Sequence, residues 1–287
     1  MTRAAIVAGL CVLLLAGPAA PAAGPRVQVL RFVDHARFAH FRTGLVVPRK
    51  LVTYVRYPTS GRPPYPLVVF GHGFSVTPGI YARLLDAWAR AGFVVAAPLF
   101  PVENANASGG PDESDLVNQP GDIRFVITRL LANARNPRSR LYHMIDPRHI
   151  AVAGQSDGGE TAFAVAYEQS YRDPRISACV VLSGARLPGE PLVGGEAPPL
   201  LAVQGTADTI NQPYLTRSFF TDVKRPKFLL WLLGAGHLPP YSTNATQLMV
   251  VERTTIAFLD HYLRRGPISR LTGAAAVPGV ARLVAKP

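Results

Sequence analysis

The sequence contains very little cysteine and lacks the common metal-binding motifs. Two Cys in 287 residues are too few for a disulfide scaffold, and neither Cys-x-x-Cys nor His-Glu-x-x-His occurs. We therefore expect no metal site and no organic cofactor. After the first 25 residues, no uncharged apolar run is long enough to span a bilayer, so we expect no stable membrane insertion.

Lysine is also scarce, although the chain is basic. The 30 Lys and Arg residues outnumber 18 Asp and Glu residues, which gives a net charge of +12, yet only four of the 30 are Lys. The arginines are spread along the chain, whereas a nucleic-acid-binding protein usually gathers its basic residues in one patch with aromatic partners. We expect no nucleic-acid partner. With 48% hydrophobic residues, the chain has enough apolar side chains to exclude disorder.

The N-terminus has the order of a secretory signal peptide. Arg3 supplies a positive charge, residues 4–16 are uncharged and apolar, and Ala-Pro-Ala at residues 20–22 fits an Ala-x-Ala cleavage site. We predict a signal peptide over residues 1–22 and a secreted or cell-envelope protein of residues 23–287. Cleavage leaves a single Cys, which cannot form an internal disulfide.

Short apolar runs alternate with helical periodicity along the rest of the chain. This alternation is typical of β-α-β units and predicts an α/β fold with a mostly parallel sheet. Apolar residues at helical spacing predict the clearest helix over residues 123–131, and a last amphipathic helix covers about residues 250–263. The predicted strands are residues 67–70, 93–97, 150–153, 176–182, 200–203 and 228–233.

Two segments have neither pattern. Residues 101–121 are polar, and we predict a long loop there. Residues 183–199 are rich in Gly and Pro and lack helical periodicity, which leaves no room for a large helical cap over the sheet. Because no internal repeat or linker interrupts residues 23–287, we predict a single domain.

A candidate nucleophile follows one of the predicted strands. Gly154-Gln155-Ser156-Asp157-Gly158 matches Gly-x-Ser-x-Gly, and it lies between the strand at 150–153 and a predicted helix. At such a strand–turn–helix junction the serine backbone is strained, and the glycines let strand and helix approach each other. The position therefore favours Ser156 as a nucleophile more than the motif alone does.

An acid and a base follow two later strands. Asp208 comes just after the strand at 200–203, and His237 comes just after the strand at 228–233. Because parallel strands end at one edge of a sheet, we expect both side chains near Ser156, in the chain order Ser, Asp, His of hydrolase triads. The weaker candidates for the acid are Asp173 and Asp222. The spare histidines, His72 and His261, are interpreted as structural.

The same edge should supply an oxyanion hole and an apolar cleft. We expect one donor to be the N–H of Asp157, which follows the nucleophile, and the other to be the N–H of Phe74 in the loop after the strand at 67–70. We predict that Phe74, Phe100 and Leu238 line a shallow substrate-binding cleft, which favours short to medium acyl chains.

These motifs resemble those of the α/β-hydrolase superfamily over nearly all of residues 23–287. Within it, His-Gly-Phe-Ser at residues 72–75, Asn-Gln-Pro-Gly-Asp at 118–122 and Phe-Leu-Asp-His-Tyr-Leu at 258–263 resemble one branch. That branch contains dienelactone-hydrolase-like, platelet-activating-factor-acetylhydrolase-like, chlorophyllase-like and cutinase-like polyester-hydrolase enzymes. The resemblance implies an α/β-hydrolase fold, a mostly parallel sheet flanked by helices, without a large cap domain.

Two positions depart from members of that branch. Dienelactone hydrolases proper have Cys where this chain has Ser156, which counts against dienelactones as substrates. Bacterial polyester hydrolases usually place Trp beside the site where this chain has Ser183, so the resemblance does not extend to an aromatic clamp.

We expect a secreted serine hydrolase that cleaves carboxylic esters through a Ser-His-Asp triad and an acyl-enzyme intermediate. Its substrate would be a small-molecule or lipid-like ester. One alternative is a peptidase or amidase that uses the same triad. Another is a catalytically silent envelope-binding protein of the same fold. Nothing in the sequence predicts the oligomeric state.

Overall fold

The computed structural model describes residues 24–287, so the predicted signal peptide at residues 1–22 lies outside the described residues. Within residues 24–287, nine strands form one sheet. The strands are β1 (Arg26–His40), β2 (Val46–Tyr57), β3 (Tyr65–Gly71), β4 (Val94–Pro98), β5 (Ile145–Gln155), β6 (Ile176–Leu182), β7 (Leu200–Gly205), β8 (Lys227–Leu232) and β9 (Ala281–Lys286).

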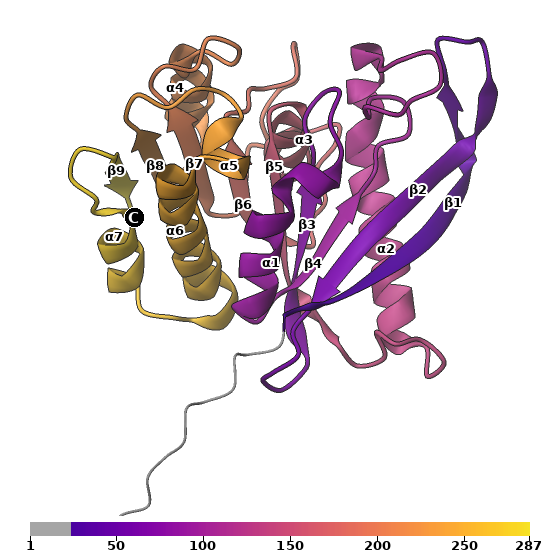
Figure 1. The fold of residues 1–287 in the computed structure, drawn as a ribbon, viewed down its shortest axis with the longest axis horizontal. Helices are drawn as coiled ribbons and strands as arrows, with labels where there is room; N and C mark the ends of the chain where they lie inside the picture. Colours follow the sequence, from indigo (N-terminus) through magenta and orange to yellow (C-terminus); the bar gives the residue numbers. More distant parts are fainter. Residues whose placement is uncertain (1–23) are drawn as a thin grey trace, which may run out of the picture.

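The sheet is mostly parallel, as predicted. Its order is β1-β2-β4-β3-β5-β6-β7-β8-β9 (Figure 1). The six strands from β4 to β8 in this order are parallel to their neighbours. β1 and β2 at one edge and β9 at the other pair antiparallel. The chain therefore has the α/β architecture that the alternation of apolar runs indicates.

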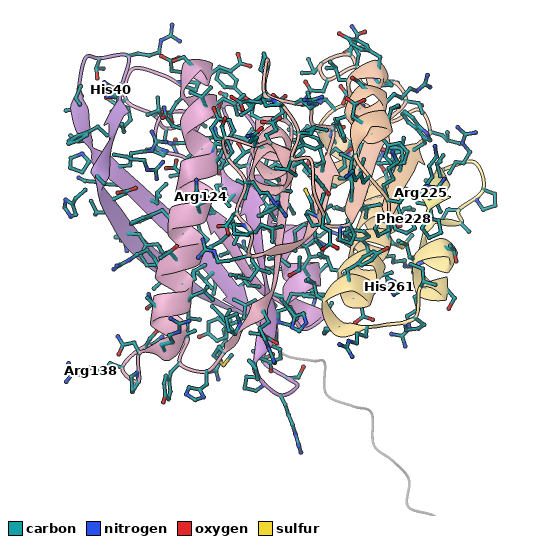
Figure 2. All side chains as sticks on the ribbon, turned by 180° about the vertical axis from the view of Figure 1, so that it is seen from behind. His40, Arg124, Arg138, Arg225, Phe228 and His261 are labelled. Atoms are coloured by element: carbon teal, nitrogen blue, oxygen red, sulfur yellow. The ribbon has the colours of Figure 1, made fainter. Side chains whose placement is uncertain are left out.

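Helices cover both faces of this sheet. One face carries α1, α6 and α7, and the view from behind shows α2, marked by Arg124, crossing the other face (Figures 1 and 2). The helices are α1 (Ala82–Arg90), α2 (Gln119–Arg135), α3 (Asp157–Tyr167), α4 (Pro213–Asp222), α5 (Pro239–Ser242), α6 (Ala245–Arg264) and α7 (Ser269–Ala275), with 3-10 helices η1 (Pro78–Tyr81) and η2 (Glu113–Asn118).

β3 shows why the sheet has a core on each face. All seven of its residues are buried. Leu67 and Val69 belong to the core shared with α2 and α3, whereas Val68 and Phe70 belong to the core shared with α1 and α6. Successive side chains of a strand point to opposite faces, so a strand covered on both sides needs an uninterrupted apolar run.

The polar segment 101–121 is not a continuous loop, contrary to our prediction. It contains η2 and the first turn of α2. Asp112 caps η2 by accepting the N–H of Ser114 at 3.1 Å, and only Asp115 is buried within η2. A short helix that buries no apolar side chain has no hydrophobic periodicity for the sequence to reveal. The segment 183–199 has no helix, as predicted.

Candidate active site

Ser156 lies at the turn between β5 and α3. Its backbone has φ 55° and ψ −126°, in the half of backbone space that a residue other than glycine rarely occupies. Its N–H donates to the carbonyl of Leu182 on the neighbouring strand at 3.0 Å. The turn is thus fixed to the sheet, and it places the serine at the carboxyl end of β5.

Close backbone contacts explain the glycines on either side of this serine. A Cβ atom at Gly154 would collide with the carbonyl group of Gly158. A Cβ atom at Gly158 would in turn collide with the carbonyl group of Gly71 at the end of β3. Strand and helix can approach this closely only because both positions lack a side chain.

His237 connects the serine to a carboxylate. Its Nε2 lies 2.9 Å from Ser156 Oγ, and its Nδ1 lies 2.8 Å from Asp208 Oδ2. Ser156 follows the carboxyl end of β5, Asp208 that of β7, and His237 that of β8. These three strands are parallel to one another in the sheet. The structure therefore brings together the three side chains that the sequence selects.

The surroundings of Asp208 favour its ionised form. The side chain is buried, and its oxygens accept the Ile210 N–H at 3.0 Å and Gln204 Nε2 at 3.2 Å. Burial alone raises a carboxyl pKa, but hydrogen bonding to His237 and the other donors outweighs burial and lowers the pKa of Asp208. An ionised Asp208 accepts the N–H of His237 Nδ1, so Nε2 is the unprotonated nitrogen that faces Ser156.

Gln155 is a site residue that our reading of the sequence missed. Its Nε2 lies 3.2 Å from both Nε2 and the carbonyl oxygen of His237. The hydroxyl of the buried Tyr81 donates to Gln155 Oε1 at 2.6 Å. The amide therefore fixes the histidine loop against the serine turn. Its place inside the Gly-x-Ser-x-Gly motif was the one available signal.

The segments that carry the two proposed oxyanion donors lie beside Ser156. Among residues 24–287, the N–H of neither Phe74 nor Asp157 donates to a backbone carbonyl. Gly73 lets the loop approach, since a Cβ there would lie 3.1 Å from Ser156 Cβ. The N–H of Ser75 donates to Glu103 O at 3.0 Å, which fixes the loop from its other side. The role of the two N–H groups stays a prediction.

The structure contradicts the prediction that Phe100 lines the substrate-binding cleft. Phe74 is 39% exposed and Leu238 is half-buried, so both can contact a substrate. Phe100 is 0% exposed, and its ring lies 4.8 Å from the ring of His72. It follows the buried strand β4 and belongs to the core beneath the site, so its side chain cannot line a surface cleft.

The spare histidine His72 is structural, as interpreted. Its Nε2 accepts the N–H of Phe100 at 3.0 Å, and its Nδ1 donates to Gly73 O at 2.8 Å. Burial lowers the pKa of His72 to about 4, so the ring stays neutral. His261 donates from Nδ1 to Gly266 O at 2.6 Å beyond α6 (Figure 2).

The alternative acids have other partners. Asp173 pairs with Arg175 at 2.5 Å, and Asp222 pairs with Arg186 at 3.0 Å. Within the described chain, no group of three or more His, Cys, Asp or Glu side chains is arranged to hold a metal ion. Along residues 24–287, no helix combines the length and the apolar character that crossing a membrane requires.

A mostly parallel sheet with helices on both faces, and a serine turn after its central strand β5, defines the α/β-hydrolase fold. The model of the chlorophyllase family matches residues 40–205. This match covers more than half of the chain, which belongs to the chlorophyllase family. A sequence comparison with curated proteins gives no match. The family match supports an ester hydrolase of the α/β-hydrolase type and agrees with the branch that the sequence motifs indicate.

Proposed function

We propose that this protein is a serine hydrolase that cleaves carboxylic esters. The observation that carries the proposal is the continuous chain of hydrogen-bonding distances from Ser156 through His237 to Asp208, 2.9 and 2.8 Å. Serine is a weak nucleophile at neutral pH and needs a base that is itself oriented by an acid. Membership of the chlorophyllase family supports an ester as the substrate class.

The first half of the reaction transfers the acyl group to the enzyme. Ser156 Oγ attacks the ester carbonyl carbon while His237 Nε2 takes the hydroxyl proton. The N–H groups of Phe74 and Asp157 stabilise the oxyanion of the tetrahedral intermediate. As that intermediate collapses, the bond to the alcohol oxygen breaks, and the imidazolium gives its proton to the departing alkoxide.

The second half releases the acid. His237 takes a proton from a water molecule, whose oxygen attacks the acyl carbon, and the bond to Ser156 Oγ breaks as the proton returns to the serine. Asp208 stabilises the imidazolium in both halves through its hydrogen bond to Nδ1. Phe74 and Leu238 are proposed to contact the acyl chain, because both are partly exposed close to the site.

Covalent labelling tests the nucleophile. We expect a fluorophosphonate to label the wild-type protein at Ser156, and we expect Ser156→Ala to lose the label. Ser177→Ala is a matched control, because Ser177 lies at the start of β6, the end opposite the site, and its Oγ donates to the carbonyl of Arg148 at 3.2 Å. Peptide mapping that places the label elsewhere would contradict the assignment.

Substrate panels separate the remaining alternatives. p-Nitrophenyl esters from acetate to palmitate report the acyl-length preference, and matched anilides report amide hydrolysis. Faster cleavage of anilides would make the protein a peptidase or amidase. A folded protein that is neither labelled nor active would be a binding protein of the same fold.

Export is proposed from the sequence alone. The positive, apolar and small-residue order of residues 1–22 is that of a secretory signal peptide. N-terminal sequencing of the protein recovered from culture medium or envelope should begin at residue 23. A mature chain that retains residues 1–22 would contradict this proposal.

A further inference from the structure

Glu103 is a fully buried carboxyl group close to the site that the triad does not use. It lies in the loop after β4 and is 0% exposed. Its Oε2 accepts a hydrogen bond from Gln119 Nε2 at the start of α2, and Gln119 Oε1 in turn accepts from Thr161 Oγ1 at 2.7 Å. Within residues 24–287, its second oxygen, Oε1, has no donor.

Asp157 is a second buried carboxyl group with one oxygen that lacks a donor within residues 24–287. It follows the nucleophile and is 6% exposed. Its Oδ1 lies 3.3 Å from Ser156 Oγ, while its Oδ2 has no donor among the described residues. The side chains of Glu103 and Asp157 act directly on each other, and each has one buried oxygen without a donor among the described residues. Two ionised carboxylates cannot bond to each other, but one proton between them satisfies both buried oxygens.

The backbone of Glu103 contacts the other side of the site. Its carbonyl accepts the N–H of Ser75, which follows Phe74 and has a positive φ of 56°. Two residues on, the N–H of Ala105 donates to Val76 O at 3.3 Å. Glu103 thus contacts both segments that carry the proposed oxyanion donors, one through its backbone and the other through its side chain.

We propose that Glu103 is a positioning residue that stays protonated, donates a hydrogen bond to Asp157, and holds the two halves of the oxyanion hole in register. The proposal rests on the proposed ester hydrolysis, since it assigns the support of that reaction's oxyanion site. The proton on Glu103 also limits the Glu103–Asp157 pair to one negative charge. A second negative charge beside the developing oxyanion would oppose the reaction.

The charges around the pair favour a proton on Glu103. Burial, reinforced by the neighbouring Asp157 carboxylate, raises the pKa of Glu103 to about 10. Asp115 also faces Glu103, although Asp115 is itself paired with Arg49. The groups that face Asp157 are Glu103 and Ser156, His237 across the site, Glu160 on α3 and Tyr81 on η1.

Two substitutions separate the hydrogen bond from the shape of the side chain. Glu103→Gln keeps a donor toward Asp157 and an acceptor for Gln119, so we expect kcat within about threefold of wild type. Glu103→Leu removes the donor and leaves Asp157 alone, so we expect kcat to fall about tenfold to a hundredfold with little change in KM. Glu168→Gln and Glu168→Leu are controls, since Glu168 is equally buried at the far end of α3, and we expect both to keep the wild-type kcat.

Two further readouts report the proton itself. The kcat of the wild type should fall as the pH rises through about 10, where Glu103 loses its proton, and Glu103→Gln should lack this fall. At about pH 9, where Glu160 with its pKa of about 8 is ionised, infrared spectra of the wild type should contain the carbonyl stretch of a protonated carboxylic acid. That band should be missing in Glu103→Gln.

The outcomes decide the proposal separately from the esterase assignment. Wild-type kcat in Glu103→Leu, equal damage in Glu103→Gln and Glu103→Leu, or an infrared band unaffected by Glu103→Gln would each overturn it. If Glu103→Leu does not fold, the pH profile and the band of Glu103→Gln still decide. Failure of the proposed function would show in a different experiment, because a fluorophosphonate would then not label Ser156 of the wild-type protein.

Discussion

The proton on His237 determines whether Ser156 can be activated. The imidazole has a carboxylate on one side and a hydroxyl on the other, and the Asp208 carboxylate accepts from Gln204 and Ile210 as well as from His237. Because Asp208 is buried and its pKa is lowered, it keeps Nδ1 of the imidazole protonated. The correct tautomer therefore depends on one oxygen atom, Oδ2 of Asp208.

Asp208→Asn tests that dependence. An amide at this position can donate to Nδ1 through its NH2 group, which would leave the proton on Nε2 and stop His237 from accepting the serine proton. We expect kcat to fall on the order of 10⁴-fold while the fold is retained, as in the comparable serine protease case. Ester hydrolysis and circular dichroism measure the two effects. Asp222→Asn is the control, because Asp222 pairs with Arg186 on the surface.

An Asp208→Asn enzyme with near wild-type kcat would transfer the role of the acid to another residue. Neither Asp173 nor Asp222 contacts His237 in the structure, so no other candidate from the sequence would be ready to replace it.

The site residues differ in how well the sequence could predict them. Ser156, Asp208 and His237 each come directly after a buried strand, and strand order alone brings them to one edge of the sheet. Glu103 has no such signal, because it reaches the site through a loop whose path depends on tertiary contacts. Phe100 was predicted to line an apolar cleft, whereas its complete burial beside His72 decides what it can contact.

The β1–β2 hairpin is attached to the helical layer by a buried ion-pair network. Arg49 on β2 forms paired hydrogen bonds of 2.6 to 2.8 Å with both Asp115 and Asp122. Arg37 near the far end of β1 adds a 2.8 Å contact to Asp122. β2 pairs with β4 over only four residues, and these ion pairs add to the apolar contacts of Phe32 and Leu51 in holding the rest of the hairpin, whose far end is marked by His40 (Figure 2).

Arg49→Met tests this attachment. The substitution fills a similar space but leaves two buried carboxylates without their main partner, so we expect the free energy of unfolding to fall by about 3 to 5 kcal/mol. Urea denaturation measures it. Arg31→Met is the control, since Arg31 is exposed on the neighbouring strand and has no ion pair within residues 24–287, and we expect less than about 0.5 kcal/mol there. Equal stability of the two variants would show that the network does not stabilise the hairpin.

Strands and helices that bury more of their residues are easier to predict from the sequence. β3, β4 and β6 to β8 are buried almost throughout, so their apolar runs are uninterrupted and the sequence identifies each of them. β5 is buried only from Ile150 onward, and the sequence identifies only that part of it. β1 and β9 are edge strands with many exposed residues, and our reading assigned no strand to either. Nor did it assign α4, whose ten residues include only three that are buried.

Access to the proposed site depends on what covers the carboxyl edge of the whole sheet. Segment 183–199 contributes no helix, and the loop after β4 is tied down rather than free. The N–H of Ser75 donates to Glu103 O at 3.0 Å, and the N–H of Ala105 donates to Val76 O at 3.3 Å, so the loop is joined to the segment after β3. Both observations argue against a lid that opens on contact with a lipid surface.

We therefore expect activity on dissolved esters, with no jump in rate at a lipid interface. Hydrolysis of tributyrin should rise smoothly as its concentration passes the solubility limit, because no closed form has to open. p-Nitrophenyl butyrate, added to the same emulsions, is the control for enzyme lost to the droplet surface. Each buried CH2 group favours binding by about 0.8 kcal/mol, but only while the cleft beside Phe74 and Leu238 has room for it. A sharp rise confined to the emulsion would contradict this prediction, and it would make the loop at residues 102–120 the segment that moves.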